Sequence, residues 1–423
     1  MEQKFDVIVV GGGASGLAAA IEASRGGASV LVLEKNHVAG RKILSTGAGK
    51  CNFSNVRVTP AAYHPPSASF LKRTFAALPP GEVARFFGGL GLLSVEGEDG
   101  RLFPRSMKAQ DVVSALDNEL GARGVQVRAL TEVTAVRRDA AGFLLEASQA
   151  RPKWQKAAPK SEKLSFRASR VILACGGPCY PQIGGTSAGY GLLRGLGHSV
   201  SPLSPAIVPL KTRETFVKDL DGVRVQAALF LTGGGRTLGE TKGELLFTAY
   251  GVSGPGPLDL SRAAAEALRK GPVHLTADLF PEYGPAEFFA LLECRTKTFA
   301  ARPFTHFTCG LTNEKVCRAA ARLAGINEAM SAGIVPARAL RAFAEVLKGL
   351  RVEITGTLGF EDAMVTAGGC DLGEIDPVTF GSKKVPGLHV TGELLDLDGN
   401  SGGFNLHLAW TSGILAGRAA AQK

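Results

Sequence analysis

The sequence predicts an α/β protein in which one nucleotide-binding domain, built on a parallel sheet, is interrupted by an inserted block. Three observations predict this fold. Residues 5–34 have the pattern strand, glycine turn, helix, strand; from about residue 198 the pattern changes to short apolar runs separated by Gly and Pro; and the last sixty residues return to strand, glycine loop and helix. A chain of 423 residues is long for a single domain, so we expect two or three.

The first half of the chain contains the elements of a buried sheet with helices. Phe5–Val10 is a continuous β-branched run, as a buried parallel strand requires. An Ala-rich stretch at 16–25 predicts a helix, and 29–33 predicts a second buried strand. Residues 108–124 predict an amphipathic helix. Further strands are expected at 125–136, 143–147 and 171–174, with an exposed hairpin loop in the basic segment between them.

The middle of the chain predicts a small β unit followed by helices. Residues 198–252 alternate short strand-like runs with turns, and 258–348 favour helices at 258–270, 285–295, 313–323 and 336–347. A strand resumes at 351–359. We therefore expect three domains: the nucleotide-binding domain (1–197 and 365–423), a β-barrel-like domain (198–257 and 349–364), and a helical insert (258–348).

Composition and charge indicate the environment. Hydrophobic residues make up 45% and charged residues 20%, which is ordinary for a globular protein with a sizeable core. No signal peptide or membrane span is recognisable, and seven cysteines without a CxxC pair favour reduced thiols in the cytoplasm. The net charge of +10 favours an anionic partner such as RNA or a nucleotide, or serves solubility alone.

The glycine turn after the first strand is the clearest local signal of function. In Gly11-Gly12-Gly13-Ala14-Ser15-Gly16, the first glycine permits a tight turn, Gly13 lets backbone amides approach a pyrophosphate, and Gly16 lets helix and strand pack closely. The start of the helix adds oriented N–H groups. Glu34 ends the second strand, where its carboxylate can accept both ribose hydroxyls of an adenosine. This motif alone barely separates FAD from NAD.

A second half-site near the C-terminus favours FAD. A strand at 388–391 leads to Gly392-Glu393, and Gly402-Gly403-Phe404-Asn405 starts a helix that reaches about residue 420. A glycine pair at a helix start exposes free amides and the positive end of the helix dipole. That end suits the flavin edge on which negative charge develops during reduction, and Glu393 could bind the ribityl hydroxyls. The alternative is an ordinary βα unit with a glycine cap.

Several long motifs resemble one known family over essentially the whole chain. Residues 40–55 (GRKILSTGAGKCNFSN) resemble the signature of the BaiN-type flavoproteins, also described as the aminoacetone oxidase family or YhiN-like FAD-binding proteins. Further matching motifs are GRLFP at 100–104, LACGG at 173–177, GELLFT at 243–248, GVSGP at 251–255, SKKVPGL at 382–388 and the stretch 391–413. Lys50 stands where the family usually has Arg, and His407 where it usually has Gln.

The resemblance implies a fold and a cofactor. It implies a glutathione-reductase-like FAD-binding Rossmann domain interrupted by a β-barrel-like unit and a helical insert. The residues that the motifs and the resemblance together place near FAD are Gly11, Gly13, Ala14, Ser15, Gly16, Glu34, Lys35, Arg41, Lys42, Cys51, Asn52, Val133, Ala174, Gly176, Gly392, Glu393, Gly402, Gly403, Phe404 and Asn405.

Candidates for chemistry other than cofactor binding are few. Cys51 is the thiol inside a cofactor motif, and is either a catalytic acid or substrate contact, or a small buried thiol without a chemical role. The histidines are scattered without ligand spacing, so we expect no metal site. The one other glycine triplet, Gly233-Gly234-Gly235, does not lead into a helix and predicts a hairpin turn. A nicotinamide dinucleotide, NAD(P)H, would therefore dock transiently rather than on a domain of its own.

The function predicted from these features is that of an FAD-dependent oxidoreductase. The resemblance implies NAD(P)H-driven reduction of a polarised C=C bond in a small molecule or a nucleobase. It leaves three alternatives: formation of dihydrouridine in large-subunit ribosomal RNA, oxidation of an aminoacetone-like amine, and an RNA-binding or assembly factor with a structural FAD. The basic segment 151–170, which contains Trp154, favours the RNA alternatives.

Overall fold

The computed structural model describes residues 3–64, 68–150 and 161–422, which form two compact units. The first unit contains residues 1–204 and 364–423, and the second contains residues 205–363. Each unit has its own hydrophobic core.

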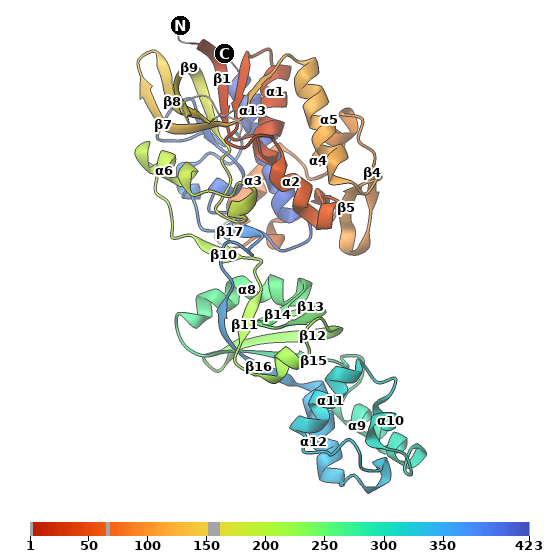
Figure 1. The fold of residues 1–423 in the computed structure, drawn as a ribbon. Helices are drawn as coiled ribbons and strands as arrows, with labels where there is room; N and C mark the ends of the chain where they lie inside the picture. The colour runs from red at the N-terminus through yellow and green to blue at the C-terminus, as the bar shows by residue number, and fades with distance from the viewer. Residues whose placement is uncertain (1–2, 65–67, 151–160, 423) are drawn as a thin grey trace. The chain divides into compact units, whose positions relative to one another are not determined.

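A seven-stranded sheet organises the first unit (Figure 1). Its order is β6-β2-β1-β9-β8-β7, and β18 also pairs with β9. The strands are β1 (Gln3–Val10), β2 (Val30–Leu33), β6 (Gln126–Arg128), β7 (Thr131–Asp139), β8 (Gly142–Ala150), β9 (Ser161–Leu173) and β18 (Leu388–Val390). Strands β6, β2, β1, β9 and β18 run parallel, so their carboxyl ends meet at one edge. This is a Rossmann-type sheet, as the sequence predicts.

Helices and a small second sheet complete this unit. The helices are α1 (Ala14–Arg25), α2 (Arg41–Ser45), α3 (Ala68–Ala77), α4 (Gly81–Gly89), α5 (Ala109–Ala122), α6 (Ala188–Gly195) and α13 (Phe404–Ala421). The small sheet has the order β3-β5-β4 and consists of β3 (Ser54–Asn55), β4 (Ser94–Glu96) and β5 (Arg101–Pro104). A further short strand is β17 (Val365–Ala367), and strand β10 (Ser204–Ala206) begins at residue 204 and continues into the second unit.

Helices α1 and α13 join the two ends of the chain. Their contact is unusually close because glycines on α13 face backbone atoms of α1. A Cβ atom at Gly413 would lie 2.2 Å from the Ser15 carbonyl oxygen, and one at Gly417 would lie 2.3 Å from the Ala19 carbonyl oxygen. The absence of a side chain at both positions lets the two helices approach backbone to backbone.

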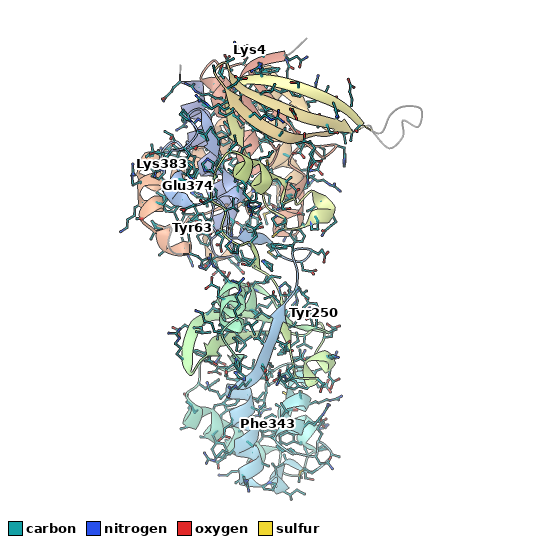
Figure 2. The ribbon with its side chains drawn as sticks, turned by 90° about the vertical axis from the view of Figure 1, so that its left-hand side faces the viewer. Lys4, Tyr63, Tyr250, Phe343, Glu374 and Lys383 are labelled. Atoms are coloured by element: carbon teal, nitrogen blue, oxygen red, sulfur yellow. The ribbon has the colours of Figure 1, made fainter. Side chains whose placement is uncertain are left out.

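The second unit contains a closed barrel with helices. The barrel order is β11-β14-β13-β12-β15-β16, from β11 (Leu210–Thr212), β12 (Arg224–Gly233), β13 (Arg236–Thr248), β14 (Gly251–Ser253), β15 (Val273–Asp278) and β16 (Leu350–Thr357). The helices are α7 (Phe216–Asp219), α8 (Pro255–Leu268), α9 (Pro285–Thr298), α10 (Phe304–Thr308), α11 (Glu314–Leu323) and α12 (Ala337–Lys348). Phe343 of α12, labelled in Figure 2, is fully buried in the core of these helices.

Two local expectations differ from the structure. Residues 273–278, which the sequence assigns to a helical stretch, form barrel strand β15, in which Val273, Leu275 and Ala277 are buried in alternation. The neighbouring helices conceal this short period-two signal. Residues 161–170, expected in an exposed loop, belong to the long strand β9, while 151–160 lie outside the described residues. The Gly233–Gly235 triplet does form the predicted hairpin turn, between β12 and β13.

Candidate active site

The loop between β1 and α1 has the geometry of a phosphate-binding turn. Gly11 has a φ of 107°, and a Cβ there would lie 2.4 Å from the Ala174 carbonyl oxygen. A Cβ at Gly16 would lie 1.9 Å from the Gly11 carbonyl oxygen, so this glycine is required for close packing of helix and loop. At Gly13, by contrast, a Cβ would meet nothing within 4 Å. The open side of the turn therefore lies at Gly13, directly before α1, where a pyrophosphate would bind.

Glu34 lies beside this turn, at the end of β2. Its carboxylate is buried and accepts hydrogen bonds from the backbone N–H of Gly12 at 2.7 Å and from Asn36, whose backbone and side-chain nitrogens both lie 2.7 Å away. These three donors fix the orientation of the carboxylate. Oε1 accepts both bonds from Asn36, whereas Oε2 accepts only the Gly12 N–H and retains a lone pair for a ribose hydroxyl. The sequence does not reveal the contribution of Asn36.

Lys42 and Glu393 meet in the middle of the site although 351 positions separate them in the sequence. Lys42 on α2 places its Nζ 3.1 Å from Oε2 of Glu393, which follows β18. The Glu393 Oε1 atom accepts hydrogen bonds from the backbone and hydroxyl of Thr366, at 2.9 and 2.8 Å. Burial would raise the pKa of the Glu393 carboxyl, but the Lys42 ammonium and these hydrogen bonds hold it below its usual value. Glu393 is therefore an anion.

The start of α13 forms the far end of the site. Gly402 and Gly403 have φ values of 114° and 99°. Asn52 lies against them: a Cβ at Gly403 would lie 2.7 Å from Asn52 Oδ1, a buried atom that has no hydrogen-bond partner among the described residues. An unpaired buried acceptor beside free helix N–H groups fits a ligand that carries both donors and acceptors, such as the pyrimidine edge of a flavin.

The two glycine loops lie at opposite ends of one site. Gly413 of α13 contacts Ser15 at the start of α1, and ten residues of helix separate Gly413 from Gly403, a distance of about 15 Å along the axis. Because Gly392 also lies against Ser15, the β18 loop reaches the same place. A phosphate end and a ring end are thus joined by helix α13, and the residues present fit an extended dinucleotide.

The remaining predicted site residues come from several elements. Lys35, Ala174 and Gly176, which has a φ of 70°, lie in the loops that follow β2 and β9 at the carboxyl edge of the sheet. Arg41 begins α2, and Val133 is buried on β7. Phe404 opens α13. The Asn405 side chain closes the 399–405 loop: its Oδ1 accepts a hydrogen bond from the Gly399 N–H and its Nδ2 donates one to the Gly399 carbonyl, each at 2.9 Å. Only the backbone N–H of Asn405 is therefore left to bind a ligand.

Cys51 is fully buried, and burial raises the pKa of its thiol to about 11. Its φ of 57° places it at the turn that leads from the α2 region to β3. A thiol with no solvent-exposed surface and a raised pKa suits packing in the core.

One group of described residues in the first unit could hold a metal ion, although the spacing of the histidines in the sequence does not indicate one. His198, Cys370 and Glu374 bring their ligand atoms within 4.8 Å of one another. Glu374 and the neighbouring Lys383 are labelled in Figure 2. Ser382 Oγ accepts two backbone N–H groups and lies 2.9 Å from His198 Nε2, so its proton points to Nε2. The Nδ1 proton then points to Glu374, 2.8 Å away, and a metal ion would have to displace it.

The comparisons with known proteins agree with this geometry. The model of the HI0933-like protein Rossmann domain family matches residues 5–419. The chain belongs to this family. It is 34% identical over 418 residues to the 3-dehydro-bile acid delta(4,6)-reductase of Clostridium scindens, with 98% of each chain covered.

Two further comparisons extend the picture. The chain is 29% identical to the ribosomal RNA dihydrouridine synthase of Escherichia coli, over 97% of this chain and 96% of that protein. The solved structure of the 3-ketosteroid delta1-dehydrogenase of Sterolibacterium denitrificans matches with a TM-score of 0.51 at 14% identity, over 99% of each chain, which shows a shared fold. The family and the full-length similarity to a reductase at 34% identity show that the protein is an FAD-dependent oxidoreductase. The described part of the chain contains no helix that meets the length and hydropathy needed to span a bilayer.

Proposed function

We propose that this protein reduces a C=C bond conjugated to a carbonyl group in a small molecule, with NAD(P)H as the reductant. The observation that carries the proposal is the full-length similarity, at 34% identity, to a protein named as a reductase of a 3-dehydro-bile acid. The site supports the proposal. The described residues form one dinucleotide-binding turn of the GxGxxG type, between β1 and α1. Because this turn would hold FAD, the nicotinamide dinucleotide would bind only transiently, next to the flavin.

The reaction balances as two hydride transfers and one proton transfer. NAD(P)H would be oxidised by loss of a hydride, and a hydride with its electron pair would add to the β-carbon of the substrate. The π component of the C=C bond breaks while the carbon–carbon single bond remains, negative charge moves to the carbonyl oxygen, and a proton from solvent adds at the α-carbon. The hydride is the chemistry that a bound FAD supplies. The chain orients the ring and stabilises the charge.

The residues proposed for holding FAD are those that the geometry brings together. Gly13, Ala14 and Ser15 would bind the pyrophosphate, and Glu34 the ribose of the adenosine. The Lys42–Glu393 pair would face the ribityl chain, and the start of α13 with Asn52 would hold the ring. No proton transfer is assigned to Cys51, because the thiol is buried. We also propose a cytosolic location, since all seven cysteines are free thiols.

An anaerobic half-reaction experiment tests this function. The flavin of the purified protein is titrated with NADPH or NADH, and the reduced protein is then mixed with a 3-oxo bile acid carrying double bonds at positions 4 and 6, the substrate class named for the relative. We expect reduction by one nicotinamide and fast reoxidation by the dienone, with a product that has gained two hydrogens. Reoxidation by oxygen but not by the dienone would contradict the proposal.

A second candidate function is dihydrouridine formation in ribosomal RNA. It is favoured by the charge distribution: the first unit has 29 Lys or Arg against 21 Asp or Glu, whereas residues 205–363 have 19 against 17. Four of the basic residues lie at 151–160, outside the described residues. Reoxidation of the reduced flavin by a ribosomal RNA fragment, together with salt-sensitive binding, would favour this function over the first.

A further inference from the structure

The motif at 100–104 brings an arginine to the ring end of the site. Its residues form β5, which pairs antiparallel with β3 so that Arg101 lies directly opposite Asn55. Asn55 is buried and its amide donates to the Gly402 carbonyl at 3.0 Å and to the Asp99 carbonyl at 3.1 Å. These bonds tie the small sheet to the loop that precedes α13.

The Arg101 side chain lies next to that loop. A Cβ at Gly402 would lie 3.7 Å from Arg101 Nε, 3.7 Å from Asn55 Nδ2 and 3.4 Å from the Phe404 ring. Asn55 is already committed to backbone carbonyls, and Phe404 has no polar atoms in its side chain. Among these three nearest side chains, Arg101 is the cationic one.

The charge of Arg101 is only weakly compensated. Its nearest recorded carboxylate oxygen belongs to Asp99, 3.6 Å from Nη2, and the Asp99 side chain is 70% exposed. An exposed pair at this distance contributes little. Lys42 differs, because Glu393 neutralises it at 3.1 Å. The Arg101 side chain is itself 28% exposed, so part of it can be reached by a ligand.

We propose that Arg101 binds the carbonyl oxygen of the substrate and stabilises the negative charge that develops there when the hydride adds to the C=C bond. This inference rests on the proposed reductase function and names the group that polarises the substrate. A fixed cation next to a developing oxyanion lowers the barrier, and loss of one such donor commonly slows a reaction about 100-fold or more. Arg101 takes up no proton and forms no covalent bond.

The test compares Arg101→Gln and Arg101→Lys with the wild type and with Arg105→Gln, a control at an exposed arginine just beyond the same strand. Four quantities are measured: FAD content, the rate of flavin reduction by NAD(P)H, the rate of reoxidation by the dienone acid, and calorimetric binding of its saturated 3-oxo analogue to the oxidised protein. For Arg101→Gln we expect unchanged FAD content and reduction rate, reoxidation about 100-fold slower, and at least 10-fold weaker analogue binding. Arg101→Lys should recover part of both losses, and Arg105→Gln should match the wild type.

The outcomes separate the two proposals. Reoxidation and analogue binding within threefold of wild type in Arg101→Gln would overturn the role of Arg101 and leave the reductase function intact. Loss of FAD from both Arg101 variants would also overturn it, because the side chain would then serve the cofactor. If the dienone does not reoxidise the wild-type protein, the proposed function fails, and the inference with it.

Discussion

At the scale of single residues, the Lys42–Glu393 pair has the sharpest energetic consequence. The Lys42 and Glu393 side chains are 31% and 17% exposed, so each charge is partly removed from water. Burial would lower the pKa of Lys42, but the Glu393 carboxylate raises it. Breaking such a pair from one side leaves an uncompensated charge.

We therefore expect Glu393→Gln or Lys42→Met alone to destabilise the first unit by roughly 2 kcal/mol or more and to weaken FAD binding. The double variant should recover most of the stability but not the FAD affinity. Chemical denaturation and FAD titration of all four proteins measure this cycle. Additive losses in stability would show that the two side chains do not interact.

A second residue-scale prediction concerns His407 on α13, whose ring is buried with Nδ1 2.8 Å from Ser54 Oγ. Burial lowers the pKa of His407 to about 4, from 6.5 in an unfolded chain. The unfolded state then binds more protons between pH 6.5 and 4, so the free energy of unfolding should fall by about 3 kcal/mol as the pH drops through this window. In His407→Gln, this decrease in the free energy of unfolding between pH 6.5 and 4 should be absent from melting curves recorded at several pH values. A variant in which the exposed His37 is replaced by Gln should show the same decrease as the wild type. An identical pH dependence in His407→Gln and wild type would refute the assignment.

At the scale of elements, the close packing of α1 and α13 holds the two half-sites together. Gly413→Ala would place a methyl group 2.2 Å from the Ser15 carbonyl oxygen, and the helices would have to separate. We expect a loss of about 1–3 kcal/mol in stability and faster release of FAD. Gly121→Ala, on α5, is the control: its Cβ meets nothing within 4 Å, so stability should not fall. Equal melting temperatures and FAD release rates in the two variants would contradict this account of the packing.

Elements also show what a sequence can and cannot predict. The β1–Gly–α1 unit can be predicted from the sequence because its glycines form one local turn. The atoms that these glycines approach belong to the turn itself or to the segments that follow the neighbouring strands β2 and β9. Strand β15 is not recognised, because six residues of alternating burial lie between helical segments. Asn36, Thr366 and Arg101 escape sequence reasoning for another reason. Thr366 contacts Glu393, and Arg101 lies next to Gly402, only because the fold brings together segments that are distant in the sequence. Asn36 lies in a loop, and nothing in the sequence indicates that its side chain bonds the Glu34 carboxylate.

At the scale of the whole molecule, the chain forms one discontinuous cofactor unit and one inserted unit of barrel and helices. The discontinuity is readable in the sequence, since two glycine-rich helix starts near opposite ends predict one site. The proximity of His198, Cys370 and Glu374 cannot be predicted from the sequence, because it arises only when the segments 198–201 and 369–371 pair in the folded chain. The division of the second unit into a β-barrel-like domain and a helical insert at 258–348 stays a proposal.

The central claim is that one FAD binds between the β1–α1 turn and the start of α13, and Gly13→Asp tests it most directly. A Cβ at Gly13 enters open space and Asp is a favourable residue before a helix, so the variant should fold at least as stably as the apo wild type. Its carboxylate should nevertheless repel the pyrophosphate. Gly81→Asp, at the start of α4 with an equally open Cβ position, is the matched control.

The measurement is the FAD content of each purified protein, with its affinity for added FAD. We predict one FAD per chain for the wild type and Gly81→Asp, and a folded, colourless Gly13→Asp protein that binds added FAD at least 100-fold more weakly. A Gly13→Asp protein that retains one tightly bound FAD would contradict the account.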